Sequence, residues 1–295
     1  MKVLVTGGTG FIGMNLVEAL AGKGHCPITL SRRSEGLPGV EHHSLDINSP
    51  EATELASRVD AVVHLAALSN ASASLDDPLL YNRVNALGTL AMLEGARRGG
   101  AGFVFASSQR IYRPSLQPIP EDGIIEPQDP YGYSKLCGES WVEMYARFYK
   151  LRGVSLRFFS VYGPGLVITS GTSGVVGIFV GKALRGEPIV VHANQRRDLT
   201  YVGDVARGIL LALERPTTPG SCYNIATGIG TSMEKLATRL CSAAGSASEI
   251  TVEGSQQFGY LVADVRKAQA QLDYSPQYDL TAGLERYIAW YRKNS

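Results

Sequence analysis

The feature that most constrains this chain is a glycine cluster that directly follows a short apolar run at the N-terminus. The run, Val3 to Val5, is typical of a strand buried in a parallel sheet, and residues 15–20 begin an amphipathic helix. Glycines between a strand and a helix let the backbone turn tightly and approach a pyrophosphate, whose charge rests on unpaired N–H groups at the helix N-terminus. A merely structural turn is the alternative. We predict a dinucleotide-binding turn with these contacts: Gly7, Gly10, Phe11, Ile12 and Gly13.

Apolar runs alternate with helical stretches over roughly the first half of the chain. Strands are predicted at 3–5, 27–30, 40–46, 61–67, 103–107 and 155–159, and helices at 15–20, 50–58, 79–98 and 133–150. This alternation predicts an α/β fold with a doubly wound parallel (Rossmann) sheet.

The regular alternation stops after Tyr162. We predict a dinucleotide-binding Rossmann domain over 1–162, to which segments near 198–228 return, and a smaller, loop-rich C-terminal substrate lobe over 163–295. Within that lobe residues 170–177, rich in Gly, Ser and Thr, predict a loop, and residues 178–185 a helix. Such a lobe would close the crevice at the carboxyl ends of the strands, where ligands bind in this fold.

Composition excludes several classes of partner. With 44% hydrophobic and 19% charged residues and a net charge of +1, nothing favours nucleic acid or an anionic membrane. The four cysteines have no C-x-x-C spacing, and the scattered histidines suggest no metal. Met1 leads directly into the first predicted strand, so we expect no signal peptide, and no apolar run approaches the ~18 residues that span a bilayer. We therefore expect a cytoplasmic enzyme.

The residues after the second predicted strand bear on the choice of cofactor. An acidic residue usually holds the adenine ribose there, about 20 residues past the glycines. This chain has Ser31, Arg32 and Arg33 instead, and guanidinium groups suit a ribose 2′-phosphate. NADP is therefore favoured over NAD, unless both arginines lie on a solvated loop. Asp46, followed by Ile47, could meet the adenine amine or only cap the next segment.

Three residues form a candidate acid–base set. Tyr131 and Lys135 are four apart at the start of a predicted helix and share a face, and Ser108 ends a strand at the crevice. A phenol of pKa ~10 becomes a base near neutral pH only if its phenolate is stabilised by about 4 kcal/mol, which a lysine ammonium and an oxidised nicotinamide ring could supply. Tyr131 would then exchange a hydroxyl proton while hydride moves to or from the nicotinamide, with Ser108 bonded to the same oxygen. An exposed Tyr–Lys pair is the alternative.

These motifs resemble the extended short-chain dehydrogenase/reductases, specifically the nucleotide-sugar epimerase/dehydratase group that includes UDP-glucose 4-epimerase. The resemblance rests on Gly7–Gly13, His64–Ala67, Asn85, Ser107–Ser108, Tyr131–Lys135, Arg157–Pro164, Arg197–Asp198 and Tyr201–Ala206. It implies a triad of Ser108, Tyr131 and Lys135, cofactor contacts at Leu65, Ala66, Ala67 and Asn85, and a contact between Arg197 and a substrate diphosphate. It also implies that Asn85 is a structural or proton-relay position near the triad. It also implies a homodimer formed through the two long helices at 79–98 and 133–150. His64, inside a buried strand, is interpreted as a packed core histidine.

Departures from the family pattern bear on the reaction. Where the family's 4,6-dehydratases carry an acidic residue after the catalytic Ser or Thr, this chain has Gln109 and Arg110, so dehydration is disfavoured. Ser160 stands where an asparagine is usual, residues 192–195 replace a glycine-rich turn, and no arginine lies at 255–260. We expect the substrate, a nucleotide-diphosphate sugar, to contact Ser108, Gln109, Ser160 and Arg197.

The leading hypothesis is C4 epimerisation of a nucleotide sugar through a transient 4-keto intermediate, by an NAD(P)-dependent enzyme. The alternative is an NADPH-dependent reductase of a keto sugar nucleotide or another natural-product carbonyl, which Arg32 and Arg33 favour because a reductase draws on the NADPH pool. A third hypothesis, a non-catalytic NADP-binding redox sensor, is disfavoured by the intact Ser108, Tyr131 and Lys135.

Overall fold

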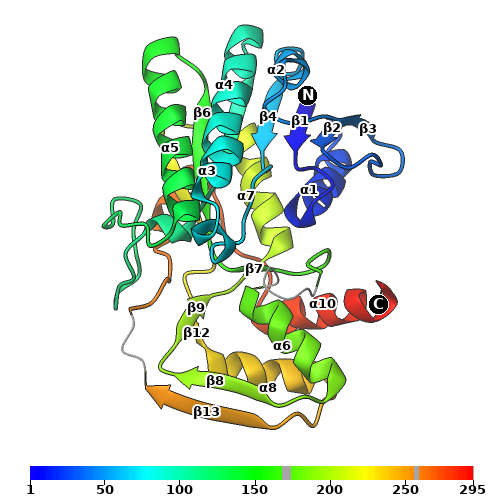
Figure 1. Cartoon of the computed structure of the whole chain (residues 1–295), viewed down its shortest axis with the longest axis vertical. Coiled ribbons are helices and arrows are strands. Elements are labelled where there is room, and N and C mark those ends of the chain that lie inside the picture. Colours follow the sequence, from blue (N-terminus) through cyan, green and yellow to red (C-terminus); the bar gives the residue numbers. More distant parts are fainter. Residues whose placement is uncertain (168–173, 256–258, 295) are drawn as a thin grey trace.

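A seven-stranded parallel sheet forms the centre of the computed structural model, which describes residues 1–167, 174–255 and 259–294 (Figure 1). The strands are β1 (Lys2–Thr6), β2 (Cys26–Ser31), β3 (Glu41–Ser44), β4 (Ala61–His64), β5 (Gly102–Ser108), β6 (Gly153–Phe158) and β11 (Cys222–Ile225). Their order in the sheet is β11-β6-β5-β4-β1-β2-β3. From β1 the chain adds β2 and β3 on one side of the sheet and then β4, β5, β6 and β11 on the other, so the loops after β1 and β4 diverge and leave a crevice. The doubly wound Rossmann sheet predicted from the sequence is confirmed.

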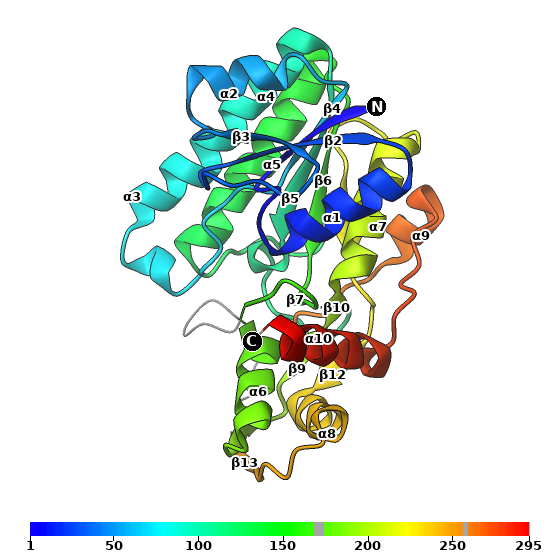
Figure 2. The ribbon, with the colours of Figure 1, turned by 90° about the vertical axis from the view of Figure 1, so that its right-hand side faces the viewer.

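Each face of the sheet is covered by helices, because alternate side chains of a strand point to opposite sides. Val3 and Val5 of β1 pack with one layer, and Leu4 packs with the other. The first layer is α1 (Phe11–Gly22), α7 (Val202–Glu214) and α9 (Arg266–Leu272). The second is α2 (Pro50–Ala56), α4 (Gly88–Gly99) and α5 (Pro130–Tyr149), and Figure 2 shows the two layers on opposite sides of the sheet.

The helix predicted at 79–98 is longer and less regular than expected. It runs as α3 (Pro78–Tyr81), a π-helix at Asn82–Leu87 and then α4. A π-helix adds one residue to a turn, so the spacing of 3.6 residues that guided the prediction is broken in its middle. Short 3₁₀ turns are η1 (Ala73–Leu75) and η3 (Gln109–Ile111).

The rest of the chain forms a smaller lobe beside the carboxyl ends of the strands (Figure 1). The elements are β7 (Val161–Tyr162), α6 (Gly174–Arg185), β8 (Ile189–Ala193), β9 (Arg196–Asp198), β10 (Thr200–Tyr201), β12 (Gly230–Ser232), α8 (Met233–Ala244), β13 (Ile250–Ser255) and α10 (Leu280–Asn294). The lobe has its own apolar core, made by residues of α6, α8, α10 and the short strands between them.

Two local predictions need correction. The loop predicted at 170–177 falls partly outside the described residues, but Gly174–Gly177 is the first turn of α6, because Val176 packs into the lobe core. The strand predicted at 61–67 ends at His64, and residues 65–67 leave the sheet to form a wall of the crevice. Among the described helices, none combines the length and the hydropathy needed to cross a bilayer.

Candidate active site

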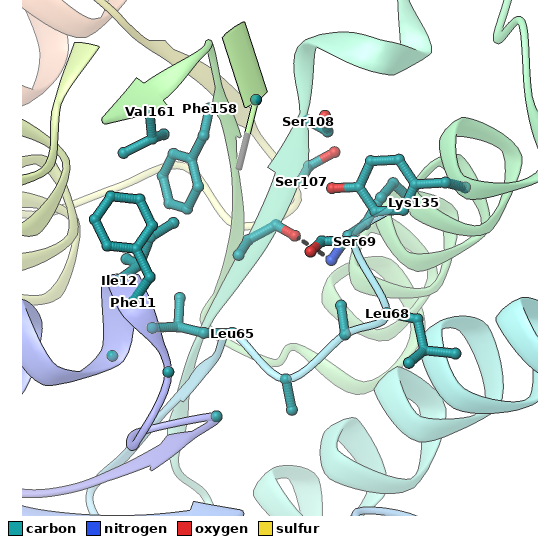
Figure 3. A pocket seen from close by; sticks show the side chains of 18 of the residues that line it. Phe11, Ile12, Leu65, Leu68, Ser69, Ser107, Ser108, Lys135, Phe158 and Val161 are labelled. Carbon is teal, nitrogen blue, oxygen red and sulfur yellow. Dashed lines mark hydrogen bonds between the residues drawn. The ribbon is translucent and has the colours of Figure 1, made fainter. Parts of the chain in front are cut away.

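A cavity of about 920 Å³ lies at the carboxyl ends of the strands, between the sheet and the smaller lobe. Figure 3 shows Phe11, Ile12 and Leu65 on one side of it, with Ser108 and Lys135 opposite. The predicted site residues that line it are Gly7, Gly10, Phe11, Ile12, Gly13, Ser31, Arg32, Arg33, Asp46, Ile47, Leu65, Ala66, Ala67, Ser108, Gln109, Tyr131, Lys135, Ser160 and Arg197. Asn85 is the one predicted residue that does not.

The glycine turn after β1 has the shape of an anion cradle. Gly7 has φ +67°, and a Cβ on Gly13 would collide with the Gly7 carbonyl oxygen, so only glycine fits at both places. Gly10 is the N-cap of α1, and no side chain in the described part of the chain accepts a capping hydrogen bond there. The first N–H groups of α1 therefore remain available at the positive end of the helix. This turn fits the pyrophosphate of a dinucleotide cofactor.

The far end of the cavity is open and carries positive charge. Ser31 Oγ accepts hydrogen bonds from Thr9 Oγ1 (2.9 Å) and from the Arg33 backbone N–H (3.2 Å), which holds the turn after β2. Arg32 and Arg33 are exposed, and neither forms an ion pair with a described residue. Both guanidiniums are therefore free to meet an anion on a bound nucleotide.

Asp46 has a structural contact of its own at this end. Its Oδ1 accepts a hydrogen bond from the Asn48 backbone N–H (2.8 Å), and the residue also lines the cavity. The carboxylate therefore caps the turn after β3, and it faces the cavity as well.

The candidate acid–base set is buried at the opposite end. Lys135 is only 4% exposed, its Nζ donates to the Ala106 carbonyl (2.8 Å), and it lies 5.9 Å from the centre of the Tyr131 ring. Burial lowers the pKa of Lys135 from 10.5 to about 7, partly offset by Glu139. Burial raises the pKa of the Tyr131 phenol, while its hydrogen bond with Ser108 acts in the opposite direction. The set is thus strongly desolvated, which is typical of catalytic groups.

The start of α5 is locked against the turn that follows Ser108. Asp129 caps the helix by accepting from the Gly132 N–H (2.8 Å), and its other oxygen lies 2.7 Å from Arg110 Nη2. A Cβ on Gly132 would lie 2.6 Å from the Arg110 carbonyl oxygen, so the two backbones are in close contact. The Arg110 N–H also donates to Ser108 Oγ (3.2 Å). These contacts fix the position of Ser108 relative to Tyr131.

Asn85 lies behind the cavity wall, in the π-helix. Its amide accepts from the Leu68 N–H (2.8 Å) and donates to the Leu68 carbonyl (3.0 Å) and to Ser134 Oγ (2.9 Å). Those contacts support the loop after β4, in agreement with the structural role that the family resemblance implies, and a cofactor contact of Asn85 stays a prediction. His64 is 1% exposed, its Nδ1 lies 2.7 Å from Thr6 Oγ1, and burial lowers its pKa to about 3.

Arg197 and Asp198 are neighbours in β9 and have opposite orientations. Arg197 lines the cavity without an ion pair to any described residue, and its pKa is lowered by burial and by the nearby Arg110. Asp198 is fully buried and accepts from the Thr227 N–H (2.9 Å) and the Gly228 N–H (2.8 Å). Arg197 is therefore available to a ligand anion, and Asp198 is structural.

Some lining residues were not predicted from the sequence. Leu68 and Ser69 continue the loop after β4, and their place next to the predicted 65–67 contacts was the available signal. Leu166 and Val175 come from the smaller lobe, where no local pattern marks a cavity wall. In the described ranges no group of three or more His, Cys, Asp or Glu side chains could hold a metal ion.

The sequence of the first 226 residues decides the family. The model of the NAD dependent epimerase/dehydratase family matches residues 3–226. The chain belongs to this family. The UDP-glucose 4-epimerase of Mycolicibacterium smegmatis is 31% identical over 316 residues, which cover 100% of both chains.

Solved structures of the family have the same fold. The UDP-glucose 4-epimerase of Thermotoga maritima, crystallised with UDP-glucose, superposes with a TM-score of 0.91 at 32% identity, covering 100% of this chain and 99% of that one. The UDP-glucose 4-epimerase of Thermus thermophilus, crystallised with NAD, gives 0.88 at 32% identity and covers 100% of both chains. This chain is therefore an NAD(P)-dependent epimerase/dehydratase-family enzyme.

Proposed function

We propose that this enzyme epimerises a UDP-sugar at C4. One observation carries the proposal: Ser108, Tyr131 and Lys135 share a single cavity with the glycine turn and with the unpaired guanidinium of Arg197. The cavity thus joins a place for a dinucleotide, an acid–base set and a cation for a substrate diphosphate. The names of the relatives, which are UDP-glucose 4-epimerases, support the same substrate class.

The residues of the set have separable roles. Tyr131 removes the proton of the sugar C4 hydroxyl, and Ser108 donates a hydrogen bond to the same oxygen. Lys135, whose pKa lies near 7, stabilises the phenolate when it is protonated. A nicotinamide cofactor held by the glycine turn would supply the acceptor for the C4 hydride and the donor for its return. The Ser108–Arg110–Gly132 contacts keep Ser108 and Tyr131 aimed at one oxygen.

We propose NADP as the preferred cofactor. Ser31 replaces the acidic residue that would repel a 2′-phosphate, and Arg32 and Arg33, which follow it, have no ion-pair partner among the described residues. The relative from Thermus thermophilus was crystallised with NAD, so this preference would distinguish the present enzyme from that one.

A second candidate function is supported by the same arginines. An NADPH-dependent reductase of a keto sugar nucleotide would use Tyr131 as the acid that protonates the new alkoxide. It would release its oxidised cofactor after each turnover, whereas an epimerase keeps it.

Two measurements separate these functions. Protein is denatured directly after purification, and the released nucleotide is identified by mass spectrometry. Near-stoichiometric nucleotide, together with interconversion of UDP-glucose and UDP-galactose without added cofactor, is expected for the epimerase. Empty protein that consumes NADPH only with a keto sugar would establish the reductase. Released NAD in place of NADP would contradict the cofactor proposal alone.

We propose that the enzyme is a homodimer joined through the layer of α4 and α5. Leu79 (83% exposed) and Leu87 (53%) lie on the helical segment that leads into α4, and Tyr133 (55%) and Phe148 (66%) lie on α5. Large apolar side chains gathered on one layer indicate a protein contact. Light scattering should give twice the chain mass, and Leu79→Asp with Phe148→Asp should give a monomer. The cytoplasmic location expected from the sequence stays a prediction.

A further inference from the structure

Gln109 and Ser160 form a pair in the cavity wall. They lie on different segments, Gln109 in the turn after β5 and Ser160 between β6 and β7, and both line the cavity. Gln109 Nε2 donates to Ser160 Oγ (3.0 Å). Ser160 is in turn held by the Thr200 N–H, which donates to its carbonyl oxygen (3.1 Å). One end of the Gln109 amide is therefore fixed by the fold.

The other end of this amide has no partner. Gln109 is 7% exposed, and no described residue donates a hydrogen bond to its Oε1. A buried carbonyl oxygen without a donor is costly, and native structures leave few such groups unless a ligand or water completes them. Because the residue lines the cavity, a ligand in that cavity can supply the missing donor.

We infer that Gln109 determines sugar specificity by accepting a hydrogen bond from a hydroxyl near the reacting C4, either O3 or O6. Gln109 follows Ser108 in the chain, and Ser108 is hydrogen-bonded to Tyr131, so the amide lies beside the groups that act on the C4 hydroxyl. Ser160 is a positioning residue, because it acts through Gln109. The inference rests on the proposed function and adds the part of the sugar that is recognised.

A hydroxyl fits this position better than an anionic substituent does. A carbonyl oxygen repels a carboxylate, and the two cations that line the same cavity near it, Arg110 and Arg197, have other assignments. Arg110 is already paired with Asp129, and Arg197 is the unpaired guanidinium assigned to the diphosphate. A site that must hydrogen-bond a hydroxyl discriminates strongly against an analogue that lacks it.

The experiment crosses an enzyme variant with substrate analogues. kcat/KM is measured for UDP-glucose and for its 2-, 3- and 6-deoxy analogues with the wild-type enzyme and with Gln109→Met, which keeps the side-chain length and removes the amide. For wild type, one of the 3- and 6-deoxy analogues should react about 10- to 100-fold more slowly. In Gln109→Met that penalty should fall below about 3-fold, because the amide oxygen that accepts the hydrogen bond from the hydroxyl is missing.

Controls separate this inference from a general loss of folding. Gln128→Met, at an exposed glutamine outside the cavity, should keep the wild-type pattern across all four substrates. Ser160→Ala should weaken the discrimination between substrates, whereas Ser160→Thr, which keeps the hydroxyl, should retain it. Equal penalties in wild type and Gln109→Met would overturn the inference while leaving the epimerase intact. Wild-type enzyme that neither binds nor converts any UDP-sugar would refute the proposed function itself.

Discussion

The two ends of the cavity differ in how far their polar and charged side chains are shielded from water. At the catalytic end Lys135 and Ser108 are 4% and 7% exposed, and hydrogen bonds to the backbone hold them in place. At the ribose end Arg32 and Arg33 are exposed and make no ion pair with described residues. Burial shifts pKa values by whole units, whereas exposed charges act weakly and are screened by salt. Changes at the catalytic end should therefore have large effects, and changes at the ribose end modest ones.

The largest expected effect comes from removing the phenol at the catalytic end. Tyr131→Phe should lower kcat by about 10²- to 10⁴-fold, because the group that exchanges the C4 proton is lost. Cofactor release on denaturation should not change. Tyr133→Phe, two residues along and exposed, is the matched control and should keep full turnover. A Tyr131→Phe enzyme as active as wild type would refute both enzymatic hypotheses.

A smaller catalytic effect, with a distinctive pH dependence, is expected for Lys135→Met. Turnover should fall by about 10²-fold because the phenolate loses its ammonium partner. The pKa of Lys135 falls from 10.5 to about 7 on folding, so the unfolded chain binds more protons between these values. Burying the charge is therefore most destabilising below pH 7, and wild-type stability rises as the pH increases from about 7 toward 10.5.

The measurement is the melting temperature of cofactor-free protein at several pH values. The difference in Tm, Lys135→Met minus wild type, should be most positive near pH 6 and should decrease steadily up to pH 10. A difference that does not vary with pH would show that Lys135 is not desolvated as the structure indicates.

The smallest effect is expected at the ribose end. Arg32→Gln combined with Arg33→Gln should raise the Kd for NADP about 10-fold and leave the Kd for NAD unchanged, because each guanidinium contributes an exposed charge contact. The difference should shrink at high salt. Arg58→Gln, at an exposed arginine away from the cavity, is the control. An equal loss of affinity for NADP and NAD would indicate that these arginines contact the adenosine and do not bind the 2′-phosphate.

The sequence predicted well those positions where a residue type or a spacing by itself indicates one local geometry. The glycines after β1 and the Tyr131–Lys135 pair mark a turn and a helix face wherever they occur, and both line the cavity. The position of Asn85 behind the cavity wall was not predicted, because the π-helix that turns its amide toward Leu68 has no signature in the residue pattern. The first turn of α6 was missed for a related reason, since Gly174 and Gly177 are poor helix formers, and it is the packing of Val176 into the lobe core that stabilises this turn.

By itself, the sequence determined the parallel sheet, the glycine turn after β1 and the candidate acid–base residues, because strand periodicity, glycine geometry and side-chain chemistry are local properties. Only the tertiary structure decided the surroundings of these residues. The shifted pKa of Lys135, the lock between Arg110 and α5, and the meeting of Gln109 with Ser160 all depend on segments far apart in the chain. Desolvation and hydrogen-bond partners exist only after those segments pack, so no local pattern can encode them.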